Sequence, residues 1–208
     1  MKRRDILYGA GALAVLSLAP NLADAAAGAG SVVGLVGACA AERGGQSIAL
    51  KLGDSVAVSD TVVVPADGKL KLRMSDGSVI SLASGTRVTL ATYQTDASGQ
   101  RQNAQLSLAQ GLLRAVVAPV SQPAAFEVST AVGTAAVRST DWFVEAKPGS
   151  SQVGVLSGSV VLRSSATGHE VTIPARWGAR LEAGRDPVDA RLWAPQEFQA
   201  VISRTDVP

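Results

Sequence analysis

The chain has 208 residues, of which 47% are hydrophobic and 17% are charged, and its formal net charge is +2. This length and composition allow one sizeable core and exclude a disordered or coiled-coil chain. The small net charge does not predict the strongly basic surface that binding to nucleic acid or to an anionic lipid surface requires.

Residues 1–25 have the pattern of an export signal. A basic start with Arg3 and Arg4 precedes an apolar span from Ile6 to Ala19, and residues 23–25 spell the cleavage pattern Ala-Asp-Ala. The paired arginines and the mildly hydrophobic span resemble a twin-arginine signal. Because this span is shorter than the roughly 20 residues that cross a bilayer, we expect a cleaved leader, a periplasmic protein and no membrane span in the mature chain.

The single cysteine, Cys39, excludes an internal disulfide. Residues 36–39, Val-Gly-Ala-Cys, faintly resemble a lipoprotein processing site, which would attach the protein to a membrane. Pro20 and Asp24 separate this site from the hydrophobic segment that it should directly follow. We therefore favour a small buried strand residue at position 39, with lipidation as the alternative.

Short strands follow the leader. From residue 62 to residue 90, apolar alternation is broken by glycine-bearing turns about every nine residues. Asp67-Gly68 and Asp76-Gly77 are typical of tight hairpins, because such turns need a positive φ. Between them, Leu70, Leu72 and Met74 fall on one face of a strand, which predicts a half-buried antiparallel sheet.

Glycines also recur inside strand-like segments, at Gly53, Gly85, Gly111, Gly158 and Gly178. A glycine in such a position marks a bulge, a bend or a close approach of two backbones. The pattern predicts an all-β fold, an antiparallel two-sheet sandwich or jelly-roll-like roll with glycine corners. A short β-solenoid-like roll is the alternative.

Two segments depart from the strand rhythm. Residues 95–105 are polar and predict a mobile hairpin loop. The tail, residues 185–208, has Pro195 where a helix could begin, with Phe198 and Val201 at helical spacing. A short C-terminal helix is the expectation for this tail.

The stretch AAVRSTDWFVEA, residues 135–146, places charges inside an apolar run. The alternation of buried positions breaks between Val137 and Asp141, which predicts a bulge or corner. Arg138 and Asp141 would close this corner, with the guanidinium bonding the carboxylate or nearby carbonyls. A role of the two residues in binding a partner is the alternative.

Several of these stretches together resemble the FecR domain, named for the periplasmic sensor of the ferric citrate system. The resemblance covers residues 31–184 and is strongest at Gly53-Asp54, at Asp76-Gly77-Ser78 and at residues 128–143. It implies a non-enzymatic, all-β extracytoplasmic domain used in signal transmission. The family usually carries glycine at the position of Ser139.

The best-known members of that family control a sigma factor through a cytoplasmic segment and read the state of an outer-membrane transporter. This sequence has no cytoplasmic domain before its hydrophobic segment and no second spanning helix. The resemblance therefore leads us to expect a free-standing exported domain rather than a direct regulator of a sigma factor.

No constellation of residues predicts catalysis. The single histidine, His169, follows a turn-like segment and is expected to be exposed, and one histidine with one cysteine gives neither a metal set nor a thiol nucleophile. No Gly-x-Ser-x-Gly elbow and no phosphate-binding glycine loop occurs. We expect no catalytic residue, no metal and no cofactor.

Two functions remain open. The first is a signalling or accessory module that binds another envelope protein, and the second is a domain that binds the cell wall or another glycan. Trp177 and Trp193 are the tentative contact residues for either partner. Exposed tryptophans on one face would favour glycan, whereas buried tryptophans and an open apolar strand edge would favour a protein.

Overall fold

The computed structural model describes residues 28–121 and 124–208. The predicted export signal, residues 1–25, lies outside these ranges. The described elements are β1 (Gly28–Val36), β2 (Ala40–Arg43), β3 (Gln46–Ala49), β4 (Ser55–Ala57), β5 (Thr61–Val63), β6 (Lys69–Met74), β7 (Val79–Leu82), β8 (Arg87–Thr95), β9 (Arg101–Val116), β10 (Ala125–Ser129), β11 (Gly133–Val137), β12 (Asp141–Lys147), β13 (Ser150–Ser157), β14 (Ser159–Ser164), β15 (Glu170–Pro174), β16 (Trp177–Glu182), β17 (Arg191–Leu192) and α1 (Pro195–Thr205).

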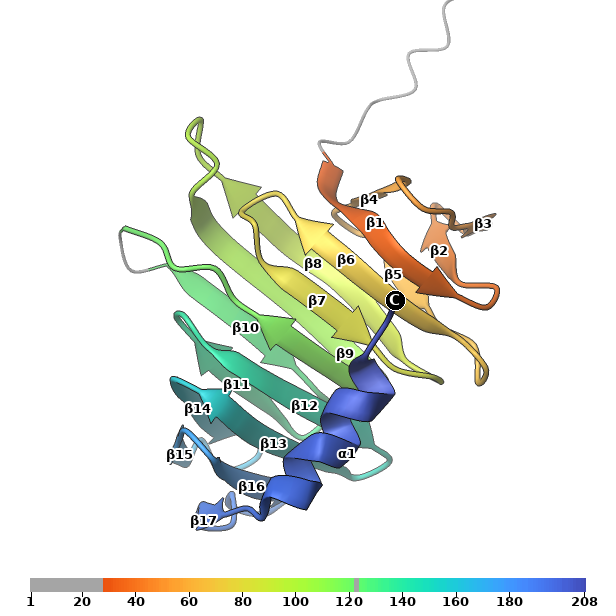
Figure 1. The fold of residues 1–208 in the computed structure, drawn as a ribbon. Coiled ribbons are helices and arrows are strands. Elements are labelled where there is room, and N and C mark those ends of the chain that lie inside the picture. Colours follow the sequence, from red (N-terminus) through yellow and green to blue (C-terminus); the bar gives the residue numbers. More distant parts are fainter. Residues whose placement is uncertain (1–27, 122–123) are drawn as a thin grey trace, which may run out of the picture.

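The strands form two layers, which we name sheet A and sheet B (Figure 1). Sheet A has the strand order β4-β1-β6-β7-β9-β12-β13-β16-β17. Sheet B has the order β3-β2-β5-β8-β9-β10-β11-β14-β15. Neighbouring strands are antiparallel except β9 and β10, which run parallel. The prediction of an all-β, antiparallel two-sheet sandwich is confirmed, and the chain winds between the two layers along its length.

The long strand β9 belongs to both sheets. Its first part pairs with β8 and β10 in sheet B, and its last part, from Gly111 onward, pairs with β7 and β12 in sheet A. Gly111 has a φ of 95°, and a Cβ atom built there would lie 2.5 Å from Thr86. Only glycine fits this position, because both the positive φ and the close backbone approach exclude a side chain.

Three other predicted glycine corners also lie where the chain crosses between the sheets. Gly53 lies between β3 and β4, Gly85 between β7 and β8, and Gly158 between β13 and β14. All three have a positive φ. The prediction of glycine corners is therefore confirmed at these positions.

Two turn predictions are wrong in detail. Gly178 lies inside β16, where a Cβ atom would come within 2.2 Å of the Trp193 ring, so this glycine makes room for an aromatic side chain instead of turning a corner. Asp67-Gly68 does not close a hairpin, because it links β5 of sheet B to β6 of sheet A. Asp76-Gly77 does join β6 to β7 as a hairpin, with a φ of 85° at Gly77.

The main core lies between the two sheets and is mostly aliphatic. Alternate residues of each strand point into it, as in β6, where Leu70, Leu72 and Met74 are buried. Cys39 is also buried there, next to the start of β2, which agrees with a small core residue at this position. Truncation of one such leucine to alanine typically costs about 2–5 kcal/mol, so each of these buried side chains contributes strongly to the stability of the sandwich.

A second, smaller core lies on the outer face of sheet A, under the C-terminal helix (Figure 1). The predicted helix is present as α1, with Pro195 in its first turn and Val201 buried against the sheet. Glu197 accepts a hydrogen bond from the backbone N–H of Ala194 at 2.9 Å, which satisfies one of the groups left free at the helix start. At the other end, the Lys69 ammonium donates to the carbonyls of Ser203 and Asp206, where the helix dipole favours a cation.

Candidate functional site: the bend after β11 and its surroundings

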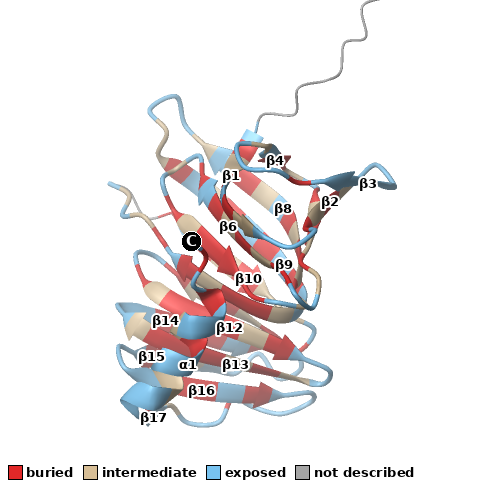
Figure 2. Cartoon of the chain, turned by 45° about the vertical axis from the view of Figure 1, so that its right-hand side comes forward, coloured by how far each residue is buried: buried red, intermediate tan, exposed pale blue. Residues whose placement is uncertain are grey.

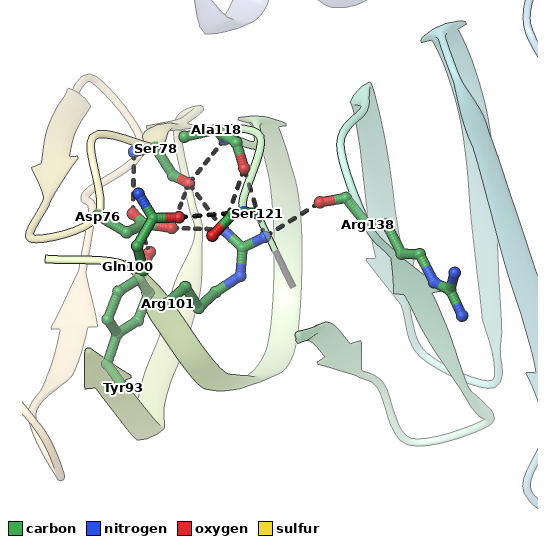
Figure 3. A network of polar contacts seen from close by, with 8 residues as sticks. All are labelled: Asp76, Ser78, Tyr93, Gln100, Arg101, Ala118, Ser121 and Arg138. Atoms are coloured by element: carbon green, nitrogen blue, oxygen red, sulfur yellow. Dashed lines mark hydrogen bonds and ion pairs between the residues drawn. The ribbon is translucent and has the colours of Figure 1, made fainter. Parts of the chain in front are cut away.

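The predicted corner lies between β11 and β12, where the chain bends at residues 138–139 and passes from sheet B to sheet A. Arg138 is exposed, and its side chain points away from the polar network beside it (Figure 3). The predicted bond between Arg138 and Asp141 is wrong. Asp141 instead binds Arg114 of β9, with N–O distances of 3.0 and 2.8 Å.

The strand register explains this choice of partner. Asp141 lies opposite Val116, and Phe143 lies opposite Arg114, so Asp141 and Arg114 are diagonal neighbours on one face of sheet A. Both side chains are about one-quarter exposed, at 24% and 23%. The hydrogen bond to Asp141, followed by its charge, raises the pKa of Arg114 above its usual value, against the effect of burial. This pair fastens the start of β12 to the neighbouring strand.

Ser139 does not need to be glycine in this chain. Its φ is not among the positive values of the described residues, and its side chain is exposed. The close approach of two backbone segments at this bend is at Gly158, which faces residues 139 and 140. A Cβ atom at Gly158 would come within 2.8 Å of the Ser139 carbonyl oxygen and of Thr140 Oγ1. The conformational demand at this corner is therefore met by Gly158.

A buried arginine, Arg101, holds the bend from inside (Figure 3). Its guanidinium donates to the carbonyl of Arg138 at 3.0 Å and to the carbonyl of Ala118 at 3.4 Å. It also forms an ion pair with Asp76, and both side chains are fully buried. The guanidinium carbon lies 5.5 Å from the centroid of the Phe126 ring, which adds a cation–π contact.

Asp76 is the centre of the polar network around Arg101. It accepts hydrogen bonds from the Ser78 backbone N–H at 2.9 Å, from the Ser78 hydroxyl at 2.8 Å and from the Tyr93 hydroxyl at 2.6 Å. Burial, followed by the hydrogen bond to Asp76 and its charge, raises the pKa of Tyr93 well above its usual value, so the phenol stays a donor. The network is closed to solvent and joins the β6–β7 hairpin to β8, β9 and the bend.

Sequence reasoning missed this network. The sequence pattern predicts Asp76 only as part of a hairpin turn, and it predicts a mobile loop over residues 95–105. The structure instead continues β8 to Thr95 and starts β9 at Arg101, which is 1% exposed. The available signal was the Asp76-Gly77-Ser78 motif, where the aspartate both caps the turn and faces the core.

A groove of about 710 Å³ runs beside the bend on the outer face of sheet B. Small side chains line most of it, including Ala125, Ala136 and Ser159, and Arg138 is also part of the lining. No described residue in this lining is a histidine, a cysteine or a carboxylate. The groove therefore offers space and one cation but no catalytic set.

The two predicted contact tryptophans differ sharply. Trp193 is only 5% exposed and packs against Phe143 and Phe198, with ring centroids 5.4 Å apart in each case. One side of its ring meets Gly178, and Arg191 lies 5.6 Å from the ring centroid. The prediction that Trp193 contacts a partner or glycan is wrong, because its aromatic surface is already used inside the protein.

Trp177 is 37% exposed and lies opposite Leu192 in the pairing of β16 with β17. Leu192 is more exposed than Trp177, at 56%. Trp177 and Leu192 form an exposed pair that we name the C-terminal apolar patch. It belongs to the last strands of sheet A.

The remaining candidates for chemistry are isolated. His169 is exposed in the turn between β14 and β15, as expected. Burial, followed by the charge of Asp67, raises the pKa of the Cys39 thiol, which disfavours the reactive thiolate. Over residues 28–121 and 124–208, no three metal-ligating side chains form a group. In the same ranges, no helix has the length and hydropathy to cross a membrane.

Comparison with known proteins finds a family that matches the middle of the chain. Residues 60–161 match the family described as FecR protein, a range that contains the Arg101 network and the bend. Two crystal structures of a candidate anti-sigma factor from Parabacteroides distasonis, at 1.65 and 2.50 Å resolution, are similar to the chain, each with a TM-score of 0.56 and 15% identity.

The similar region covers 67% of this chain and 63% or 62% of the other, so it spans less than two thirds of that protein. At this identity the likeness shows a common fold. No curated protein matches the chain.

Proposed function

Because this chain carries a FecR domain, we propose that it is a non-enzymatic regulatory protein of the periplasm that acts by binding another envelope protein. The fold shared with a candidate anti-sigma factor supports a regulatory role. The basic, apolar and Ala-Asp-Ala pattern of residues 1–25 supports export.

The observation that carries this proposal is the contrast between buried tryptophans and exposed aliphatic side chains. Trp142 and Trp193 are buried, so Trp177 is the one tryptophan with an accessible face. Sugar-binding surfaces rely on exposed aromatic rings, whereas protein contacts use apolar patches and strand edges. Exposed aliphatic side chains lie on strands at both ends of the sandwich, at Ile48 in β3 and at Leu192 in β17. This distribution favours a protein partner over a glycan.

Cross-linking in the envelope fraction tests the proposal. The full chain, tagged after Pro208, is cross-linked in intact cells and purified under denaturing conditions. We expect one envelope protein to be enriched over a control that carries the tag alone. Recovery of peptidoglycan without an enriched protein would overturn the proposal in favour of glycan binding.

Export is tested separately. Replacement of Arg3 and Arg4 by lysine should leave the protein uncleaved in the cytoplasm if the twin-arginine route is used, because that route reads the arginine pair. The wild-type protein should be found in the periplasm with a new N-terminus near residue 26. A mature protein that reaches the periplasm equally well with both lysines would contradict the twin-arginine route but not export itself.

A further inference from the structure

The strand β3 forms a free edge of sheet B. It pairs with β2 and with no other strand of the described residues, and all four of its side chains are exposed. Figure 2 shows β3 as an exposed segment that projects from one end of the sandwich. A strand edge of this kind presents unpaired backbone donors and acceptors.

The hairpin register identifies which backbone groups are free. The two-residue turn at Gly44-Gly45 makes Arg43 and Gln46 a hydrogen-bonded pair, and such pairs alternate along an antiparallel ladder. The bond from the Leu50 N–H to the Cys39 carbonyl, at 2.9 Å, continues the same alternation. Ser47 and Ala49 therefore direct their N–H and C=O groups away from β2, toward open solvent.

The opposite edge of sheet B, β15, is protected. The bond from the Ser164 N–H to the His169 carbonyl, at 2.9 Å, sets its alternation, so Glu170, Thr172 and Pro174 face outward. Pro174 has no N–H to donate, and Glu170 carries a charge. Both features are typical of edges that resist the addition of another strand. No proline and no charged residue occurs in β3.

We propose that the β3 edge binds an extended segment of the partner protein, which adds to sheet B as a further strand; this rests on the proposed function. The free groups of Ser47 and Ala49 match an extended backbone. The neutral strand, with Ile48 40% exposed and Leu52 66% exposed just after it, fits an uncharged segment with aliphatic side chains.

The size of the edge argues against a second copy of this chain as the occupant. A strand of four residues is about 13 Å long. A stable dimer interface needs about 800 Å² from each partner, far more than two such edges can bury. An extended segment that belongs to a larger partner has no such requirement, because its other contacts lie elsewhere.

Two proline substitutions test the edge without disturbing the hairpin. Ala49→Pro and Ser47→Pro each remove an outward N–H and leave the bonds between β2 and β3 in place. Thr172→Pro is the matched control, since it removes an outward N–H from β15. A photo-cross-linking amino acid at position 48 reports what lies on β3 in cells. Circular dichroism and the melting temperature show that each variant is folded.

We expect Ala49→Pro and Ser47→Pro to lower the yield of the cross-link to the partner by about tenfold or more, while Thr172→Pro leaves it unchanged. The cross-linked partner peptides should map to one short, uncharged segment. Equal cross-link yields in the wild type and in all three proline variants would overturn the inference. A cross-link to a second copy of the chain would overturn the proposed occupant, and recovery of peptidoglycan alone would overturn the proposed function itself.

Discussion

The strand β9 carries two arginines that differ strongly in how far their side chains are buried. Arg101 lies at the start of β9 in sheet B, and its side chain and that of its partner Asp76 are completely buried. Arg114 lies near the end of β9 in sheet A, and its side chain and that of its partner Asp141 are each about one-quarter exposed. Arg101 joins three separate segments, and Arg114 joins two adjacent strands. Both pairs join an arginine to an aspartate, so the residue types are the same. The Arg101 pair is a central structural contact because it is buried and joins more segments, whereas the Arg114 pair is a local contact.

The buried pair should give the largest effect. Replacement of Arg101 by Met leaves the Asp76 carboxylate buried without its cation, and it frees the carbonyls of Ala118 and Arg138. We expect a loss of about 3–5 kcal/mol in the free energy of unfolding, and a fall in melting temperature of about 10 °C. Urea unfolding measures this directly. A loss below about 1 kcal/mol would contradict a central role for the network.

A third pair, Arg43 with Asp60, is intermediate. Asp60 is completely buried, whereas the Arg43 side chain is 46% exposed. Burial acts to raise the pKa of Asp60, but the hydrogen bonds from Arg43 and from the Ala57 N–H, with the charge of Arg43, hold it below its usual value. The carboxylate therefore stabilises the folded state above the ordinary carboxyl pKa, and this contribution is lost as the pH falls through the lowered value.

Asp60→Asn tests this pair through its pH dependence. We expect a loss of about 1–3 kcal/mol at neutral pH, because hydrogen bonds to a charged acceptor are weakened. The difference between the variant and the wild type should shrink as the pH falls below about 4. Unfolding curves at pH 7 and pH 3 check both expectations. A difference that stays constant over this range would show that the charge of Asp60 contributes nothing.

The pair of Arg114 and Asp141, with about one-quarter of each side chain exposed, should contribute less. In a double-mutant cycle with Arg114→Met and Asp141→Asn, we expect a coupling energy of about 1 kcal/mol, because water competes for both groups. Raising the salt concentration should reduce the coupling. A coupling above about 3 kcal/mol would mean that this pair behaves like the buried one.

The smallest effect is expected for Arg138→Ala. Its side chain is exposed, and the carbonyl that Arg101 binds belongs to the backbone and stays in place. The free energy of unfolding should therefore change by less than about 0.5 kcal/mol. A fall in melting temperature similar to that of Arg101→Met would restore a structural role for the Arg138 side chain.

Much of the fold could be predicted because its signals are local. Apolar alternation identified strands such as β6, and glycines marked the crossings between the sheets, at positions 53, 85 and 158 between strands and at position 111 inside β9. The C-terminal helix followed from Pro195 and from helical spacing. Each of these features depends on backbone geometry within a few residues.

The site was less predictable, because its contacts join residues that are far apart in the chain. Arg101 and Asp76 are 25 residues apart, and Arg114 and Asp141 are 27 apart. Trp193 resembled a surface contact in the sequence, yet Gly154 and Gly178 leave room for its ring on the outer face of sheet A. No local sequence pattern around these residues predicts which distant residue each of them contacts.

Period-two alternation and glycine conformation were thus enough to predict an all-β protein with corners at particular residues, and to favour two sheets over a solenoid-like roll, because both act through the local backbone. Strand order and register were needed to show that Arg101, not Arg138, holds the bend, and that β3 is open while β15 is protected. The reason is that a charge or a strand edge takes its role from the neighbour opposite it, and that neighbour is brought there by the packing of the whole sandwich.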